Sequence, residues 1–389
     1  MVTRLFNAGM IVTPTERIVH GTVVVGDDGR IAYVGPEAKA PRVEGPGLDL
    51  CGRWLLPGLT DIHVHGGNGV SFGIPGQVAR DLALYSAWVA RTGVTGFLCS
   101  VAAPDAEMLI HVVEECAAAL DAGLPGAEGL GIHLEGPFLN PAKKGAFNVA
   151  WLRQPKVAEA DDLLRAGRGW VRQMTLAPEL AGAQQVAARM RAAGVVVSLG
   201  HTDSDYELAS AALRGDFTHV THTFNAQRGF GQREPGVFGA ILTSDSVTAE
   251  LIADGVHVHP GAMRVLLRCL GTDRVVLITD AMAAAGLSDG EYNLVGNTVT
   301  VQNGRATLPD GTLAGSTVAL SECVRNLSRQ AGVPMPEAVK MASLNPAQAM
   351  GLANRLGSIA VGRDASLTVV DREMAVWLTM VKGKVVYSK

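Results

Sequence analysis

The sequence predicts an α/β protein whose larger part is a TIM-like (β/α)8 barrel, joined to a small β-sandwich domain built from both chain ends. Three observations support this architecture. Short apolar runs alternate with helical patterns through the middle of the chain. Turn-rich β patterns occupy both ends. Histidines and carboxylates recur where the central strands are expected to end, which is where barrel enzymes carry their active sites.

The two chain ends share one β pattern. Short β-branched runs such as 22–25 and 31–34 are separated by glycine-rich turns, and 366–370 has the same character. Neither end contains enough strands for a stable sheet of its own, so we expect the two ends to form one domain together. The expected parts are 1–56 plus 357–389 for the β-domain and 57–356 for the barrel.

The middle of the chain contains eight apolar segments with helical stretches between them. The expected strands are 59–65, 94–100, 129–135, 171–177, 195–201, 217–222, 247–254 and 274–280. Residues 77–91 illustrate a helix, because their apolar side chains recur at helical spacing. A doubly wound open sheet is the alternative, but no GxGxxG follows the first strand. We expect a β-hairpin within 286–315 and three helices between 317 and 351.

Composition excludes several classes of function. With 389 residues, 48% hydrophobic and 18% charged, the chain can bury a large core. A net charge of −4 offers no basic surface for nucleic acid. No apolar run is long enough for a bilayer, and the N-terminus lacks a secretory pattern. Five scattered cysteines without a CxxC indicate reduced thiols in a cytoplasmic protein.

His63 and His65 are the first indication of chemistry. They lie two residues apart on the expected first strand, so their side chains would share one face, and two glycines follow. Two imidazoles at a strand end suit a divalent metal better than a core. A single histidine is more often structural, but this pair is followed by further histidines in similar positions.

Three more strand ends carry a further set of ligands. Glu135, His201 and His222 end the expected third, fifth and sixth strands. Two imidazoles and one carboxylate leave a position for water, as in catalytic zinc sites. His63 and His65 could hold a second ion, with Glu135 or a hydroxide as the bridge.

Each of these residues also has a simpler interpretation. Glu135 could cap the loop that begins at 136–137, and Asp280 could be a helix N-cap. His219 alternates with a neighbour that faces the barrel, so we expect it to face away, whereas His133 shares the direction of Glu135 and could support it. The remaining histidines, taken as solvated or structural, are His20, His111 and His259. The joint placement at five strand ends favours a metal site.

Ten sequence blocks together resemble the amidohydrolase superfamily, and within it the N-acetylglucosamine-6-phosphate deacetylases. The blocks are 56–58, 61–66, 133–138, 176–179, 200–202, 221–226, 233–236, 253–257, 279–281 and 311–316. The HxH of 63–65 is shared across the superfamily, whereas 134–137, 224–226 and 233–236 in this order are more specific. The fourth strand lacks the metal-bridging lysine of hydantoinase-like relatives, so Glu135 would take its place.

The resemblance implies roles for individual residues. Glu135, His201 and His222 would bind the main metal, and retention of His63 and His65 indicates the two-metal subgroup. The cofactor would be one or two divalent ions per subunit, zinc first, with iron, manganese or cobalt as alternatives. The substrate contacts would be Ala146, Asn225, Ala226, Arg233, Asp254, His257, Leu313, Ala314 and Gly315.

Within that set, Asn225, Ala226 and Arg233 would hold the phosphate of a phosphosugar, and Leu313–Gly315 would line the N-acetyl pocket. In the family the matching arginine can reach in from a neighbouring subunit, which suggests a homodimer; the simpler interpretation of Arg233 is a surface arginine beside a turn. Phe147 departs from the family, which often has a polar residue after 143–145.

The implied activity is metal-dependent hydrolysis of the acetamide of N-acetylglucosamine 6-phosphate. Asp280 would take a proton from a metal-activated water and return it to the amine leaving group, while His257 would help to stabilise the oxyanion. Two alternatives stay open. One is an amidohydrolase acting on a different N-acyl amine or cyclic amide, and the other is a catalytically silent metal-binding paralogue.

Overall fold

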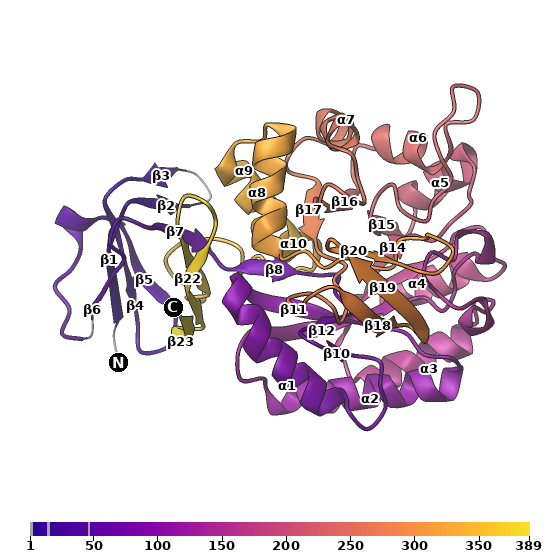
Figure 1. The fold of residues 1–389 in the computed structure, drawn as a ribbon, viewed down its shortest axis with the longest axis horizontal. Helices are drawn as coiled ribbons and strands as arrows, with labels where there is room; N and C mark the ends of the chain where they lie inside the picture. The colour runs from indigo at the N-terminus through magenta and orange to yellow at the C-terminus, as the bar shows by residue number, and fades with distance from the viewer. Residues whose placement is uncertain (1–2, 14–15, 46) are drawn as a thin grey trace.

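The structure, a computed structural model, describes residues 3–13, 16–45 and 47–389. Its larger part is a barrel of eight parallel strands, and its smaller part is an all-β domain that contains both chain ends (Figure 1). The predicted fold class, a (β/α)8 barrel with a separate domain of terminal strands, is therefore confirmed. The boundaries 56/57 and 356/357 stay a prediction.

The barrel strands follow one another in chain order around the sheet. They are β8 (Leu59–Asp61), β11 (Val94–Val101), β12 (Glu128–Glu135), β13 (Val171–Leu176), β14 (Val196–Leu199), β15 (Phe217–Val220), β16 (Thr248–Ile252) and β17 (Val275–Ile278). The last seven lie within two residues of the predicted bounds at either end. Long apolar runs flanked by glycine made these strands readable from the sequence.

The first strand is shorter than predicted, and this is a correction. Strand β8 ends at Asp61 because its carboxylate turns back to accept hydrogen bonds from Thr279, with Oδ2 2.6 Å from Thr279 Oγ1. The backbone N–H of Asp280 donates to the carbonyl of His63 at 2.9 Å. These bonds join the first strand to the last and close the barrel. His63 and His65 therefore lie on an irregular segment rather than on a regular strand.

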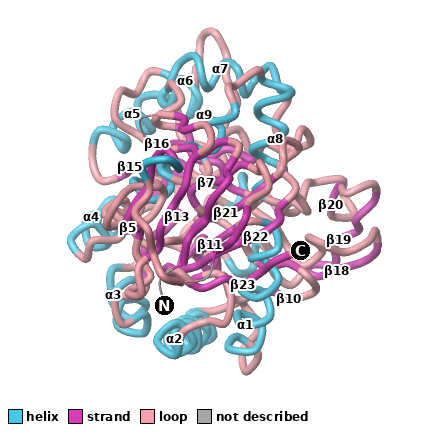
Figure 2. The backbone as a smooth tube through the Cα atoms, turned by 90° about the vertical axis from the view of Figure 1, so that its left-hand side faces the viewer, coloured by secondary structure: helices cyan, strands magenta, loops and turns pink. Residues whose placement is uncertain are grey.

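Helices surround the strands, as Figure 2 shows from the side of the small domain. They are α1 (Val78–Val89), α2 (Ala106–Ala122), α3 (Val157–Gly167), α4 (Ala183–Ala192), α5 (Tyr206–Arg214), α6 (Gly236–Leu242), α7 (Pro260–Leu270), α8 (Leu320–Ala331), α9 (Met335–Met341) and α10 (Leu344–Ala349). The main apolar core lies between these helices and the strands, with fully buried residues such as Phe97, Leu134 and Val186. The three helices expected after residue 317 are present.

The excursion after β17 differs from the expected hairpin. It is a three-stranded antiparallel sheet of β18 (Gly290–Leu294), β19 (Asn297–Gln302) and β20 (Arg305–Thr307). A turn at 303–304 divides the second half of the expected hairpin into two strands, β19 and β20. A second short pair, β9 (Gly66–Gly67) and β10 (Val70–Ser71), follows the first strand. Within the described ranges, no helix combines the length and the apolar character that a membrane crossing requires.

Two sheets make up the small domain. One contains β1 (Thr3–Ala8), β4 (Gly21–Val25), β5 (Ile31–Pro36) and β6 (Gly47–Asp49). The other contains β2 (Met10–Val12), β3 (Arg17–Ile18), β7 (Trp54–Pro57), β21 (Leu367–Val370), β22 (Val376–Val381) and β23 (Lys384–Ser388). Strands β7 and β21 pair antiparallel, so the two chain ends are joined directly. Leu5, Val23, Leu55 and Leu378 pack between the sheets.

Candidate active site and metal centre

Glu135, His201 and His222 converge at the carboxyl ends of β12, β14 and β15. Glu135 Oε1 lies 3.2 Å from Nε2 of each histidine, and the two Nε2 atoms lie 3.0 Å apart. All three side chains are at least 96% buried. Metal–nitrogen bonds of about 2.0–2.1 Å in tetrahedral geometry separate ligand atoms by about 3.3 Å, so the spacing suits one divalent cation.

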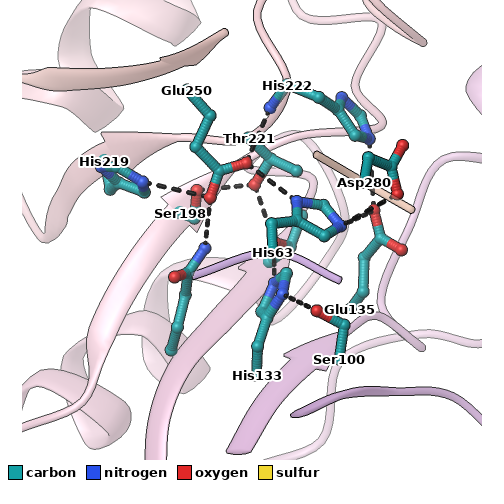
Figure 3. Close-up of polar contacts among 12 residues, drawn as sticks. His63, Ser100, His133, Glu135, Ser198, His219, Thr221, His222, Glu250 and Asp280 are labelled. Atoms are coloured by element: carbon teal, nitrogen blue, oxygen red, sulfur yellow. Dashed lines mark hydrogen bonds and ion pairs between the residues drawn. The ribbon is translucent and has the colours of Figure 1, made fainter. Parts of the chain in front are cut away.

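A second group lies beside the first. The Nε2 atoms of His63 and His65 lie 3.6 and 3.4 Å from Asp280 Oδ1. Glu135 stands between the groups, because its Oε1 is 3.3 Å from His63 Nε2 and its Oε2 is 2.9 Å from His65 Nε2. Figure 3 shows Glu135 and Asp280 near the ring of His63. One carboxylate could therefore bridge two cations.

The backbone turns sharply as it leaves three of these strands. His201, His222 and Asp280 follow β14, β15 and β17 closely and have positive φ angles of 47°, 25° and 49°. Residues other than glycine rarely adopt this conformation, and such strain is concentrated at functional sites. The turn points each side chain into the mouth of the barrel.

The donor atoms are arranged for a cation rather than for one another. The carbonyl of Lys143 accepts from Nδ1 of His201 at 2.8 Å, which leaves the lone pair on Nε2. Nε2 of His63 is buried and makes no hydrogen bond to any described residue. A buried, unpartnered nitrogen facing two carboxylates fits a position for a metal ion, so this chain's residues fit the metal that the resemblance implies.

The electrostatics of the cluster support the same conclusion. Burial would lower the pKa of His63, but Glu135 and Glu250 outweigh it and raise that pKa well above the ordinary value. The pKa of His65 rises to about 9, where burial is outweighed by Asp280 and Glu135. Burial opposes ionisation of Glu135, yet His63 and its other histidine neighbours hold the pKa of Glu135 well below its usual range. In the metal-free protein, His63 and His65 therefore carry protons that a bound cation would replace.

The site opens into a cavity of about 260 Å3. The lining includes six of the predicted substrate contacts: Ala146, Asn225, Ala226, His257, Leu313 and Gly315. It also includes residues that the sequence reading did not single out for this purpose: Gly145, Phe224, Leu294, Val295 and Thr312. Phe147 lines the cavity as well, with its ring edge-on to His201 at a centroid distance of 5.3 Å.

Three predicted contacts lie outside this lining. Asp254 lies behind His257 and accepts from its Nδ1 at 2.6 Å. Ala314 is fully buried beneath the cavity wall, in a cluster with residues of β18 and β19. Arg233 is exposed on the segment between β15 and α6 and does not line the cavity of its own chain.

Gly315 is required by its surroundings. Its φ is +65°, and a Cβ at this position would lie 3.0 Å from the carbonyl oxygen of Asp280. Any larger residue would therefore press on the backbone of Asp280.

One simpler interpretation and one side-chain direction expected from the sequence are wrong. Asp280 is not a helix N-cap, because the next helix in the described chain, α8, begins only at Leu320. His219 does not face away from the barrel, because its Nε2 lies 3.2 Å from Glu250 Oε1 in the interior. His219 and His222 do not alternate in direction, because the chain leaves β15 at Val220, before His222. His133 bonds to Ser100 and Thr175 and meets the ring of His63 edge-on, 4.5 Å between centroids.

Glu250 is the residue that sequence reasoning missed. It is fully buried in β16, and its Oε2 lies 2.9 Å from Nδ1 of His63. A sequence signal existed, because a glutamate stands alone in an otherwise apolar strand at 249–252. Its partners come from distant segments, which the sequence could not connect.

Comparisons with known proteins show the family of this chain. Residues 54–386 match the Amidohydrolase family model. N-acetylglucosamine-6-phosphate deacetylase of Bacillus subtilis (strain 168) is 36% identical over 385 residues, covering 97% of this chain and 95% of that protein. N-acetylgalactosamine-6-phosphate deacetylase of Escherichia coli O157:H7 is 38% identical over 331 residues, covering 85% of this chain and 87% of that protein.

A solved structure extends the likeness to three dimensions. It is that of a mutant N-acetyl-D-glucosamine-6-phosphate deacetylase from Mycobacterium smegmatis in complex with N-acetyl-D-glucosamine-6-phosphate. It superposes with a TM-score of 0.91 at 34% identity, covering 100% of this chain and 99% of that one. The chain therefore belongs to the amidohydrolase family and, within it, to the N-acetylglucosamine-6-phosphate deacetylases.

Proposed function

We propose that this enzyme hydrolyses the acetamide of N-acetylglucosamine 6-phosphate, giving glucosamine 6-phosphate and acetate. The observation that carries the proposal is the convergence of Glu135, His201 and His222 beside Asp280, at the mouth of a barrel. The cavity next to this cluster, about 260 Å3 in volume, suits part of a sugar phosphate. Relatives that act on this class of substrate support the choice.

A divalent metal would be held by Glu135, His201 and His222, with His63, His65 and Asp280 around a second ion. When bound, such a metal lowers the pKa of water toward about 7 and polarises a carbonyl. We propose zinc, since imidazole and carboxylate ligands at this spacing suit it. Glu135 touches both groups and would keep them at a fixed separation.

Asp280 is the proposed general base and acid. Burial would raise its pKa, but His63 and His65 outweigh that effect and lower it, so the carboxylate is ionised and able to accept a proton. It takes the proton from water as the carbonyl carbon is attacked. It then returns that proton to the nitrogen, because an amine leaves poorly as an anion.

His257 is proposed to face the reacting carbonyl and steady the oxyanion. Its Nδ1 is 2.6 Å from Asp254 Oδ2, and its backbone N–H donates to Oδ1 of the same carboxylate at 2.8 Å. Asp254 thus fixes the ring orientation and turns Nε2 toward the substrate. To steady an oxyanion, the ring would carry a proton on both nitrogens, with Nδ1 donating to Asp254 and Nε2 to the substrate oxygen. The pKa of Asp254 is lowered, because the hydrogen bonds and charge of His257 outweigh burial, so this carboxylate stays ionised.

The two ends of the substrate are assigned by side-chain chemistry. Leu313 and Gly315 would enclose the acetyl methyl group, since they are apolar or small, with Ala314 buried behind them. Asn225 and Ala226 would meet the phosphate, together with Arg233 from a second copy of the chain. The exposure of Arg233 away from its own cavity supports a homodimer in which each copy completes the other's site.

N-acetylgalactosamine 6-phosphate is the second candidate substrate. The 38% identity to a deacetylase of that name favours it, and the two sugars differ at one stereocentre, C4. We also propose a cytoplasmic location, supported by buried cysteines without disulfide partners at positions 99, 116 and 323.

The test is acetate release from both 6-phosphates and from free N-acetylglucosamine. Turnover of N-acetylglucosamine 6-phosphate with the highest kcat/KM supports the proposal. A preference for the galactosamine substrate selects the second candidate. Metal content without acetate release from any of the three would overturn deacetylation and favour a silent paralogue.

A further inference from the structure

Glu250 places a carboxylate in the interior of the barrel. It is fully buried on β16 between Ala249 and Leu251. No described lysine or arginine pairs with it, and its ion-pair partners in the described chain are His63 and His219. Burying such a charge without a fixed cation is unfavourable, and an apolar side chain of this size would suit a core strand better.

Its hydrogen bonds connect the two candidate metal groups. Oε2 accepts from Nδ1 of His63 and from the backbone N–H of His222, each at 2.9 Å. Oε1 accepts from Nε2 of Gln173 at 2.8 Å and faces Nε2 of His219 at 3.2 Å. Figure 3 shows the carboxylate at the centre of this network, with His63 and His222 on one side.

We propose that Glu250 is a positioning residue for the metal centre. Its Oε2 atom fixes the orientation of His63 in one group and of His222 in the other. The inference rests on the proposed function, because it presupposes that the two groups bind metal. At His63, the bond to Nδ1 places the ring proton there and leaves the Nε2 lone pair facing the cation. Without it, the proton could move to Nε2 and the ring could turn.

At His222, Glu250 acts through the backbone. The ring Nδ1 of His222 makes no hydrogen bond to any described residue, so no partner holds this ring on the side away from the metal position. His201 differs, because the carbonyl of Lys143 holds its Nδ1. The φ of His222 is +25°, a conformation that needs support, and the bond from its N–H to Glu250 supplies that support. The ligand direction at His222 therefore depends on Glu250.

Glu250→Gln is the most informative substitution, because it keeps the shape. The amide oxygen can remain on the side of His63 and His222. The new amide N–H group would face Gln173, whose own Oε1 is buried without a hydrogen bond in the described structure and can turn to accept. The fold should persist, but the bonds from His63 and His222 lose their ionised acceptor and weaken, since a charge-assisted hydrogen bond is about twice as strong as a neutral one.

The matched control is Gln173→Met. Gln173 meets only the other oxygen of Glu250 and contacts neither His63 nor His222 in the hydrogen bonds of the described chain. This variant disturbs the same buried network to a similar extent and leaves the Oε2 side intact. Any effect shared by both variants would report general loosening of the interior.

The experiment measures metal binding directly. Each full-length protein is stripped with a chelator and titrated with Zn2+ against a chromophoric chelator. The absorption spectrum of the Co2+-loaded form is then recorded. We expect Glu250→Gln to lose about 10–100-fold in affinity for the more weakly bound ion, with a changed Co2+ spectrum, whereas Gln173→Met stays within about twofold of wild type.

Three results would overturn the inference. The first is wild-type affinity for every bound ion and an unchanged spectrum in Glu250→Gln. The second is an equal loss in Gln173→Met. The third is a wild-type chain that binds no divalent ion. That result would overturn the proposed function as well, whereas the first two would overturn only the role of Glu250.

Discussion

The two ends of strand β12 each carry a glutamate that is largely shielded from water, yet the partners of the two carboxylates differ in kind. At the amino end, Glu128 meets permanent cations, with both oxygens 2.9 Å from the guanidinium of Arg355 and one 2.8 Å from Lys382 Nζ. At the carboxyl end, Glu135 is surrounded by imidazoles at 2.9–3.3 Å. Imidazole can give up its proton near neutral pH and bind a metal instead, whereas guanidinium keeps its proton and does not bind metal.

The contrast assigns a stabilising role to the amino end of β12 and a role in metal binding and turnover to its carboxyl end. The Glu128 network is complete, and it ties the barrel to the C-terminal segment that carries Arg355, Asp364 and Lys382. The Glu135 cluster is complete only with a cation. Substitutions at the amino end should therefore affect unfolding, and those at the carboxyl end should affect metal content and turnover.

The largest effect is expected for Glu135→Gln. Loss of the carboxylate shared by both groups should remove bound metal and lower acetate release by at least about 10^3-fold. Metal analysis of the purified variant, beside an acetate assay, checks this. Glu128→Gln is the matched control, since it makes the same change at the other end of the strand. Wild-type metal content in Glu135→Gln would contradict the contrast.

Asp280→Asn should separate chemistry from metal binding. Removing the proposed proton acceptor should lower kcat by about 10^2–10^4-fold, while the ion at Glu135, His201 and His222 is retained. The measurement is turnover normalised to metal content. Near-wild-type turnover would remove Asp280 from the proton-transfer role.

Arg233→Ala should act on the phosphate end alone. We expect KM for N-acetylglucosamine 6-phosphate to rise about 10–100-fold, which corresponds to the loss of a charged hydrogen bond. Turnover of unphosphorylated N-acetylglucosamine should stay within about twofold. Equal losses on both substrates would argue against a phosphate contact.

The smallest effect is expected for Glu128→Gln. At pH 7 it should lower the free energy of unfolding by about 1–2 kcal/mol, since it breaks a largely buried ion pair without removing its volume. Burial opposes ionisation of Glu128, but the hydrogen bonds from Arg355 and Lys382 outweigh it and lower its pKa.

The pH dependence of that stability follows from the sign of the shift. A lowered pKa in the folded state gives stability that is present above the unfolded value and is lost as the pH falls through the folded value. The difference in unfolding free energy between wild type and Glu128→Gln should shrink below about pH 4.5, the ordinary glutamate value. A difference that stays constant down to pH 3 would contradict the ion-pair account.

The sequence predicted what depends on local pattern. Apolar runs bounded by glycine located seven of the barrel strands within two residues, and the alternation of strands and helices indicated the barrel. Rules of barrel architecture then brought Glu135, His201 and His222 together, although the chain separates them by up to 87 positions. Once the barrel topology is known, residues at the carboxyl ends of its strands are expected to meet, however far apart they lie in the sequence.

The missed features depend on contacts that no local pattern encodes. Strand β8 stops early because Asp61 bonds to Thr279, 218 positions away. The direction of His219 was wrong because the left-handed turn at His222 breaks the alternation. Glu250 was overlooked because its role appears only when β8, β13, β15 and β16 close into a ring. Its partner Gln173 lies 77 positions away in the sequence.

The central claim is that one cation joins Glu135, His201 and His222. Anomalous diffraction from crystals of the metal-loaded protein, collected on both sides of the metal absorption edge, tests it most directly. The account predicts an anomalous peak about 2.0–2.2 Å from Nε2 of both histidines and from a Glu135 carboxylate oxygen. A metal-loaded, catalytically active crystal with no peak at this position would contradict it.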